Sequence, residues 1–185
     1  MHNANVTPLW PLRPGHMVIV LRPDGVNAVP ELALGEVMIM VTNSGARGAN
    51  HDWTPSVDSI GALLFVHVRV FTPSFLHTYS MLSCAELGCV TNLRVPRTHL
   101  IFSLATASAD IQKVDMVSNP HHPFRYITLG TFSVQILRAL EQRKNDVASC
   151  VHDLVKKESA RQKSTESSSG MPGNNNEAVR SDGDE

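Results

Sequence analysis

The sequence predicts an α+β domain in which a compact antiparallel sheet packs against two helices. Several short runs of β-branched and aromatic residues are separated by Pro, Gly, Asn or Ser, which is typical of strands joined by turns. Two stretches, at about 73–87 and about 137–157, instead place apolar residues at helical spacing. With 42% apolar and 18% charged residues, the 185-residue chain can form one domain with a substantial core.

The first third of the chain predicts two strands and a long loop. Residues 1–16 are Pro-rich and lack the cationic start and apolar run of a secretory signal. Residues 17–22 are β-branched and end at a Pro-Asp-Gly turn signal, so they predict a strand. Residues 32–41 predict a second strand, and the polar residues that follow to position 56 predict an exposed connection.

A strand followed by a helix is predicted in the middle of the chain. Residues 60–71 alternate two sets of side chains with a period of two, as a half-buried strand requires. Thr72 can cap a helix that has Pro73 at its first position and ends before Gly88. We therefore expect a helix at about 73–87.

The remaining segments predict further strands, a second helix and a tail. Short strands are expected at 89–95, 99–105 and 111–117, and a central strand at 123–137, where Phe132, Val134 and Ile136 alternate. Apolar residues then recur at helical spacing over about 137–157. Residues 158–185 lose this periodicity and are rich in Ser, Asn, Gly and charge, so we expect a disordered tail. The single domain is accordingly 17–157.

The cysteines argue against a disulfide framework and a structural zinc site. Cys84, Cys89 and Cys150 are odd in number and include no CxxC pair. On the predicted helix, Cys84 would lie two turns, roughly 10 Å, from His77, which is too far for a thiolate and base pair. A reducing compartment and structural thiols are the simpler interpretation.

Neither the histidines nor any sequence motif indicates an enzyme. His67 lies within the alternating strand, where a structural role is the commoner one. His121 and His122 are adjacent and would point to opposite faces of an extended segment, so they do not form a metal site alone. The phosphate-loop, dinucleotide, nucleophile-elbow and HExxH patterns do not occur. We expect no catalytic residue, cofactor or metal.

Charge gives candidate contact residues but no strong nucleic-acid signal. The chain carries 16 Lys and Arg against 17 Asp and Glu, so it has no strongly basic balance. Apolar stretches are broken before about 18 residues, the minimum for a membrane-spanning helix, so we expect a soluble protein or one lying on a membrane. The candidate residues facing phosphate or lipid head groups are Arg94, Arg97, Arg143, Lys144, Lys156 and Lys157.

Two blocks of sequence resemble the matrix proteins of rhabdoviruses. "FVHVRVFTPSFLHTYS" looks like a family segment in which an alternating strand runs into a helix, and "HPFRYITLGTFSVQI" is similar to a later strand. A lysine-rich arm and a PPxY or PTAP budding motif, which better-known members have, do not occur here, and short matrix proteins of plant-infecting members fit the length best. The matching positions are Phe65, Val68, Val70, Pro73, Thr78, Tyr79, Ser80, Pro123, Phe124, Gly130 and Thr131.

The resemblance implies a virion structural protein. Such a protein self-associates and links the nucleocapsid to the envelope membrane during assembly and budding. Its partners would be the viral nucleoprotein, the glycoprotein tail, a membrane contacted peripherally and further copies of itself. Its locations would be the virion, the host cytoplasm, the inner face of host membranes and the host nucleus.

Two alternatives remain at this point. One is another small viral structural or accessory protein of capsid or movement type, which two stacked antiparallel sheets without a helix at 73–87 would favour. The other is a cytosolic enzyme using Cys84 or His67, which rests on residue identity alone.

Overall fold

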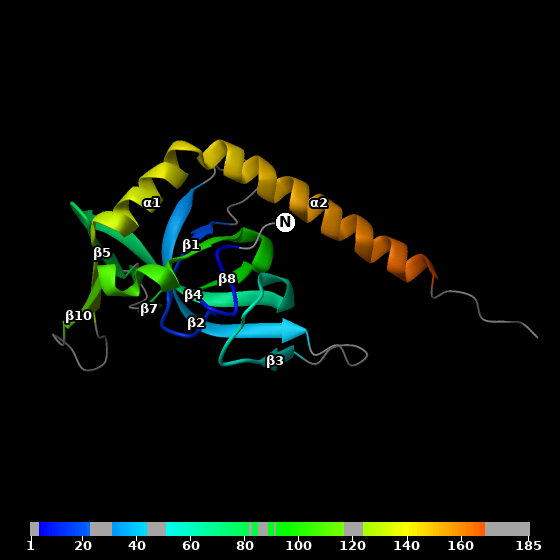
Figure 1. The fold of residues 1–185 in the computed structure, drawn as a ribbon, viewed down its shortest axis with the longest axis horizontal. Coiled ribbons are helices and arrows are strands. Elements are labelled where there is room, and N and C mark those ends of the chain that lie inside the picture. Colours follow the sequence, from blue (N-terminus) through cyan, green and yellow to red (C-terminus); the bar gives the residue numbers. More distant parts are fainter. Residues whose placement is uncertain are drawn as a thin grey trace, which may run out of the picture.

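Most of the chain forms a curled antiparallel sheet with two helices lying against it (Figure 1), which confirms the predicted α+β class. The computed structural model describes residues 4–22, 31–43, 51–81, 83–84, 89–90, 92–116 and 124–168. The predicted Pro-Asp-Gly turn, the adjacent histidines 121 and 122, and residues 169–185 of the predicted tail lie outside this part.

The strands follow one another mostly through short turns. They are β1 (Met17–Leu21), β2 (Leu32–Asn43), β3 (His51–Trp53), β4 (Leu63–Phe75), β5 (Thr78–Met81), β6 (Ser83–Cys84), β7 (Cys89–Val90), β8 (Asn92–Pro96), β9 (Leu100–Ser103), β10 (Ile111–Met116) and β11 (Phe124–Leu129). The helices are α1 (Thr131–Gln142) and α2 (Lys144–Ser168), and the 3₁₀ helices are η1 (Ile60–Ala62), η2 (Arg97–His99) and η3 (Leu104–Asp110).

Strands β2 and β4 are the central strands of the main sheet. The strand order is β10-β11-β5-β4-β2-β1-β9, with β3 also on β2 and β8 also on β4, while β6 and β7 pair separately. One half of β4, residues 65–69, pairs with β8, and the other half, residues 71–75, pairs with β5. A register shift after Val37 interrupts the β2–β4 ladder, and such bulges bend a sheet.

The inner face of the curled sheet encloses the first core. Valines of β1, β2, β4 and β8 meet there, and Leu100 of β9 joins them. Ala4, Val6 and Leu12 are buried in the same core, and Leu12 exchanges backbone hydrogen bonds with Val57. The Pro-rich segment expected to precede the domain therefore contributes to its core.

The outer face forms a second core under α1. Phe71 of β4, Leu34 of β2 and Leu129 of β11 pack there with Val134 of the helix. Helix α2 continues across the sheet and buries Val151 against strands β1 and β9. Both helices thus lie on one side of the sheet, as Figure 1 shows.

The start of α1 is capped by a residue from a distant part of the chain. Gly130 occupies the N-cap position and has no side chain to cap the helix. Asp110 supplies the cap, because its Oδ2 accepts a hydrogen bond of 2.7 Å from the backbone N–H of Ser133. The backbone oxygen of Asp110 also accepts from the Gly130 N–H at 2.7 Å.

The helix predicted at about 73–87 is wrong. Strand β4 continues through Pro73 to Phe75, and β5 returns from Thr78 after a two-residue turn. Pro73 is tolerated because β2, the other neighbour of β4, pairs no further along it than Phe71. Polar Thr78 and Ser80 alternate with apolar Tyr79 and Met81, which is a strand pattern. The prediction of a helix did not take this pattern into account.

The strand predicted at 123–137 and the single helix at 137–157 are also corrected. Strand β11 ends at Leu129, and α1 begins at Thr131, because Asp110 and Gly130 provide a helix start there. Two helices then replace the single one, and α2 extends to Ser168. The first part of the expected disordered tail, residues 158–168, is therefore helical.

Candidate functional site

An exposed apolar tip lies at the end of the β4–β5 hairpin. Phe75 and Leu76 are adjacent and are 72% and 79% exposed. Leu76 has φ of +47°, a left-handed conformation that residues other than Gly adopt at a cost of about 1 kcal/mol or more. Two apolar side chains are thus held in solvent on a strained turn.

The tip is anchored to the neighbouring strand β11. The backbone carbonyl of His77 accepts a hydrogen bond of 3.0 Å from the N–H of Leu129, the last residue of β11. Phe132, at the start of α1 and three residues after Leu129, is 53% exposed. The hydrogen bond to Leu129 therefore holds the turn against the end of β11.

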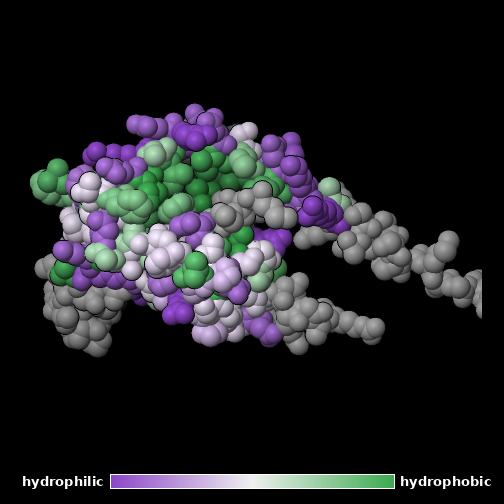
Figure 2. All heavy atoms as spheres, viewed as in Figure 1, coloured by the Kyte–Doolittle hydropathy of each residue, from purple (hydrophilic) through white to green (hydrophobic). Residues whose placement is uncertain are grey.

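A cleft of about 340 Å³ lies at the base of the same hairpin, between α1 and strands β2, β4 and β5. Its apolar lining includes Leu34, Phe71 and Leu137. Figure 2 shows apolar atoms gathered in the hollow beneath α1, with hydrophilic atoms along its rim. The residues that give the rim its charge are Arg22, Glu31, Arg138 and Glu141.

The polar groups around the cleft are suited to binding rather than to acid–base chemistry. Arg22 and Glu31 form an ion pair of 3.0 Å across the cleft mouth. Burial raises the pKa of the Tyr79 phenol, although the nearby Arg138 opposes this shift. Tyr79 therefore stays protonated at neutral pH and can donate a hydrogen bond to an occupant.

A second polar feature is the ion cluster around the buried carboxylate of Glu36. Its Oε2 lies 3.3 Å from Nη1 of Arg69, and its Oε1 lies 2.9 Å from Nζ of Lys113. Lys113 also donates to the backbone oxygen of Gly15. The cluster joins β2, β4 and β10, which explains how an acid is kept in the sheet interior.

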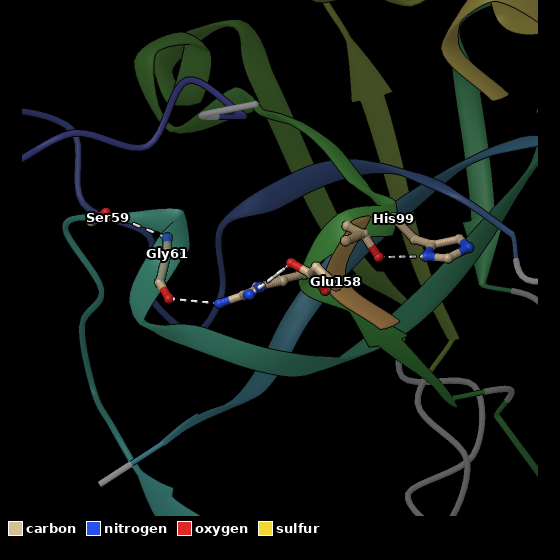
Figure 3. A network of polar contacts seen from close by, with 6 residues as sticks. Ser59, Gly61, His99 and Glu158 are labelled. Atoms are coloured by element: carbon tan, nitrogen blue, oxygen red, sulfur yellow. Dashed lines mark hydrogen bonds and ion pairs between the residues drawn. The ribbon is translucent and has the colours of Figure 1, made fainter. Parts of the chain in front are cut away.

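Arg94 and Arg97 hold the structure together more than they form a free surface. The guanidinium of Arg94 stacks on Phe65, with its central carbon 3.8 Å from the ring centroid. Arg97 donates to Oε1 of Glu158 from Nε at 2.9 Å and from Nη2 at 2.6 Å, and to the Gly61 carbonyl from Nη1 at 2.8 Å. Figure 3 shows this link between Gly61 of η1 and Glu158 of helix α2. Arg97 is thus only partly available to a ligand.

The other four predicted contact residues lie along the two helices. Arg143 and Lys144 are at the helix junction, where they pair with Asp146 at 3.7 Å and Glu141 at 3.1 Å. Lys156 and Lys157 are exposed on α2, about 18 Å further along its axis at 1.5 Å per residue. The structure therefore distributes the six basic residues over separate places.

The candidate catalytic residues are also separated. The half-buried His67 packs edge-on against Phe65, with ring centroids 5.4 Å apart, while His77 lies at the hairpin tip. The helical spacing assumed for His77 and Cys84 is wrong, because His77 lies in the β4–β5 turn and Cys84 lies on β6, with β5 between them. Cys84 is instead opposite Cys89 in the β6–β7 ladder, and Cys150 is exposed on α2.

Within the described residues, no group of three or more His, Cys, Asp or Glu is placed to hold a metal ion. No helix of the same residues has the length and apolarity needed to span a bilayer.

The sequence interpretation missed the tip, the cleft and the Glu36 cluster. The alternation at 78–81 could have revealed a second strand, and residues 76–77 would then have been recognised as a turn. No protein-family model matches this chain, and neither a curated protein nor a solved structure matches it.

Proposed function

We propose that this chain is a viral matrix-type structural protein that self-associates and links the nucleocapsid to the envelope membrane. The observation that carries the self-association is the apolar tip at Phe75 and Leu76 beside an apolar cleft on the same hairpin. The virion role rests on the resemblance of two sequence blocks, which is a likeness of residues only: the first folds as a hairpin and the second as a strand followed by a helix.

The tip and the cleft are complementary in shape and polarity. The tip is convex and apolar, and the cleft is concave with an apolar floor. The tip does not fill its own cleft, because Phe75 and Leu76 are mostly exposed. A second copy of the chain is therefore the occupant that we propose.

The position of the tip favours a reciprocal dimer. Pro73 lines the cleft and lies only two residues before Phe75, so tip and cleft face a partner from the same edge. A two-fold axis at this edge would place each tip in the other copy's cleft. Burying one Leu and one Phe contributes about 3–6 kcal/mol per tip, and association costs about 4–15 kcal/mol, so we expect weak, concentration-dependent pairing.

Sedimentation velocity across a concentration series tests this proposal. Leu76→Asn removes one of the two apolar side chains of the tip and retains a residue that tolerates left-handed backbone, so we expect the fold to be kept and the weak dimer to be lost. Thr72→Arg places a long charged side chain across the cleft, and we expect it to abolish pairing too. The matched control is Leu9→Asn, which alters another leucine, 85% exposed, on the N-terminal turn.

Mixing the two variants gives the sharpest test. The Leu76→Asn protein keeps an intact cleft and the Thr72→Arg protein an intact tip, so the mixture can re-form one of the two contacts. We expect heterodimers in the mixture although neither variant pairs alone. Unchanged self-association in Leu76→Asn, or a wild-type protein that stays monomeric at high concentration, contradicts the tip-in-cleft contact.

The matrix role has its own test. Wild-type protein should co-sediment with nucleoprotein–RNA complexes and float with vesicles that contain acidic phospholipid at low salt. Indifference to both would refute the matrix role even if the protein dimerises.

A second candidate is a small capsid or movement-type protein. The strand and hairpin at 73–81, in place of a helix, favour it, although the main sheet is one curled sheet and not a stacked pair. Negative-stain electron microscopy of concentrated protein distinguishes the two, because closed shells would support a capsid and overturn the matrix proposal.

A further inference from the structure

A second cavity, distinct from the cleft under α1, lies where the start of β1 meets η3 and β10. It measures about 200 Å³. Its apolar wall includes Met17, Leu104 and Ile111, and its polar lining comes from His16, Ser108 and Lys113. These three side chains come from segments about a hundred residues apart, so the fold itself assembles the site.

His16 lines this cavity, and its ring carries a polar atom that has no partner among the described residues. Its Nδ1 is buried and has no hydrogen-bond partner within the described part of the chain. A buried imidazole nitrogen without a partner costs free energy unless something binds to it. His16 itself is held in place because its backbone carbonyl accepts from the N–H of Val37 at 2.9 Å.

Lys113 brings a positive charge with a donor to spare. Among the described residues its ammonium donates to Oε1 of Glu36 and to the Gly15 carbonyl, which uses two of its three N–H groups. Gly15 can present that carbonyl because it adopts φ of +84°, which favours glycine. The third N–H is available for an occupant of the cavity.

The charges around the cavity have an excess of cations. Glu36 pairs with both Arg69 and Lys113. Arg13, in the N-terminal segment, adds a further positive charge close enough to affect the pKa of His16. Asp110, at the end of η3, is engaged elsewhere, because its carboxylate caps α1. Burial lowers the pKa of His16, and Arg13 and Lys113 lower it further, as expected in a positive environment.

We propose that this cavity binds a small tetrahedral oxyanion of the phosphate class between His16, Ser108 and Lys113. Lys113 and the Ser108 hydroxyl donate to the anion, and the protonated His16 ring beside them adds a second positive charge. The anion offsets the positive surroundings, so binding favours the charged imidazole and is coupled to uptake of a proton. This site is independent of the tip and cleft and stands if those are disproved.

Proton NMR of the full chain tests the proposal, with sulfate as the probe because its charge is constant across the range in which His titrates. Sodium sulfate replaces sodium chloride at constant ionic strength while the His16 and His99 ring signals are followed against pH. We expect the His16 pKa to rise by about one unit at saturation, which is about tenfold tighter binding to the charged form. His99, whose pKa is lowered by burial alone, is the internal control and should not move.

Variants make the test specific. His16→Gln and the milder Ser108→Ala should each weaken sulfate binding, by about fivefold or more and about twofold respectively, whereas His99→Gln should leave it unchanged. Equal movement of His16 and His99, or undiminished binding in both cavity variants, would overturn the proposal.

The source of the oxyanion is separated in a final arm. Inorganic phosphate is titrated in solution, and vesicles of phosphatidylcholine with or without phosphatidic acid are tested by flotation. Vesicle binding that depends on phosphatidic acid and is lost in His16→Gln identifies a lipid headgroup, and phosphate binding alone identifies a free ion. Failure of both probes refutes the site.

Discussion

Replacing Asp110 with alanine is expected to lower the free energy of unfolding by about 2 kcal/mol, although Asp110 is 21 positions before the first residue of the helix that it caps. The substitution removes the acceptor for the Ser133 N–H, and an N-cap acceptor contributes about 1 kcal/mol. A carboxylate at a helix N-terminus contributes about 0.5 kcal/mol more. Ser133 is fully buried, so its N–H would also be left without a partner, at a cost toward the upper end of the range for a lost cap.

Two further variants separate these contributions. Asp110→Asn keeps an acceptor and removes the charge, so we expect a loss of about 0.5 kcal/mol, a quarter of that in Asp110→Ala. Gly130→Ala should also destabilise, because an added Cβ would lie 1.9 Å from Oδ1 and 2.9 Å from the backbone oxygen of Asp110. The double variant Asp110→Ala/Gly130→Ala relieves the first clash but not the second, so its loss should be smaller than the sum of the single losses.

Urea unfolding followed by far-ultraviolet circular dichroism measures all four proteins. A change of less than about 0.5 kcal/mol in the free energy of unfolding of Asp110→Ala would contradict its role as the cap. Losses in Asp110→Ala and Gly130→Ala that simply add in the double variant would contradict it too. Because α1 forms one wall of the cleft, the same variants should also weaken self-association.

The remaining predictions concern individual polar groups. The hydroxyl of Ser133 is buried and has no partner among the described residues, so Ser133→Ala should raise the free energy of unfolding in urea by up to about 1 kcal/mol. A clear loss of stability would contradict this. Arg97→Ala should lower the free energy of unfolding by about 1 kcal/mol in the same urea assay, and Glu158→Gln by less, because the ion pair is partly exposed. Hydrogen exchange in Arg97→Ala should increase first in the C-terminal half of α2, and unchanged exchange there would count against the link. Burial lowers the pKa of His16 and His99 below the ordinary 6.5, so the unfolded chain takes up these protons first. Stability should therefore be constant above about pH 7 and fall as the pH drops through 6.5, and variants of both histidines to Gln should reduce that fall.

The strands could be predicted from sequence because their signal is local. Residues 17–22 and 111–117 are short β-branched runs bounded by turn residues, and both are strands close to the expected limits. The long alternating segment at 60–71 is likewise a strand, which continues to Phe75. Strand β1 is buried on both faces and has a continuous apolar run, whereas residues 66–70 of β4 alternate between buried and half-buried.

The helices were harder to predict because tertiary contacts decide them. Thr72 and Pro73 have the chemistry of a helix start, yet pairing with β5 keeps the chain extended there. Conversely, residues 131–137 alternate like a strand but form a helix, whose cap comes from Asp110. No window of local sequence contains both partners of that cap.

The candidate sites depend on the same long-range contacts. The cavity brings His16 next to Lys113, and the cleft brings Arg22 next to Arg138. Such pairs cannot be identified until the strand order is known. The six basic residues were selected for their charge alone, and sequence did not indicate that Arg97 would be used to hold α2.

The packing of strand β4 determines how precisely copies of this chain could be spaced in an assembly. It lines the inner core with Val66 and Val68 and the outer core with Phe71, and it ends in the tip. A slip of one residue would turn each of these side chains to the opposite face, so both cores resist it. The distance from tip to cleft is thereby fixed by the packing of the interior, and any lattice built from this contact would inherit its spacing from the register of a single strand.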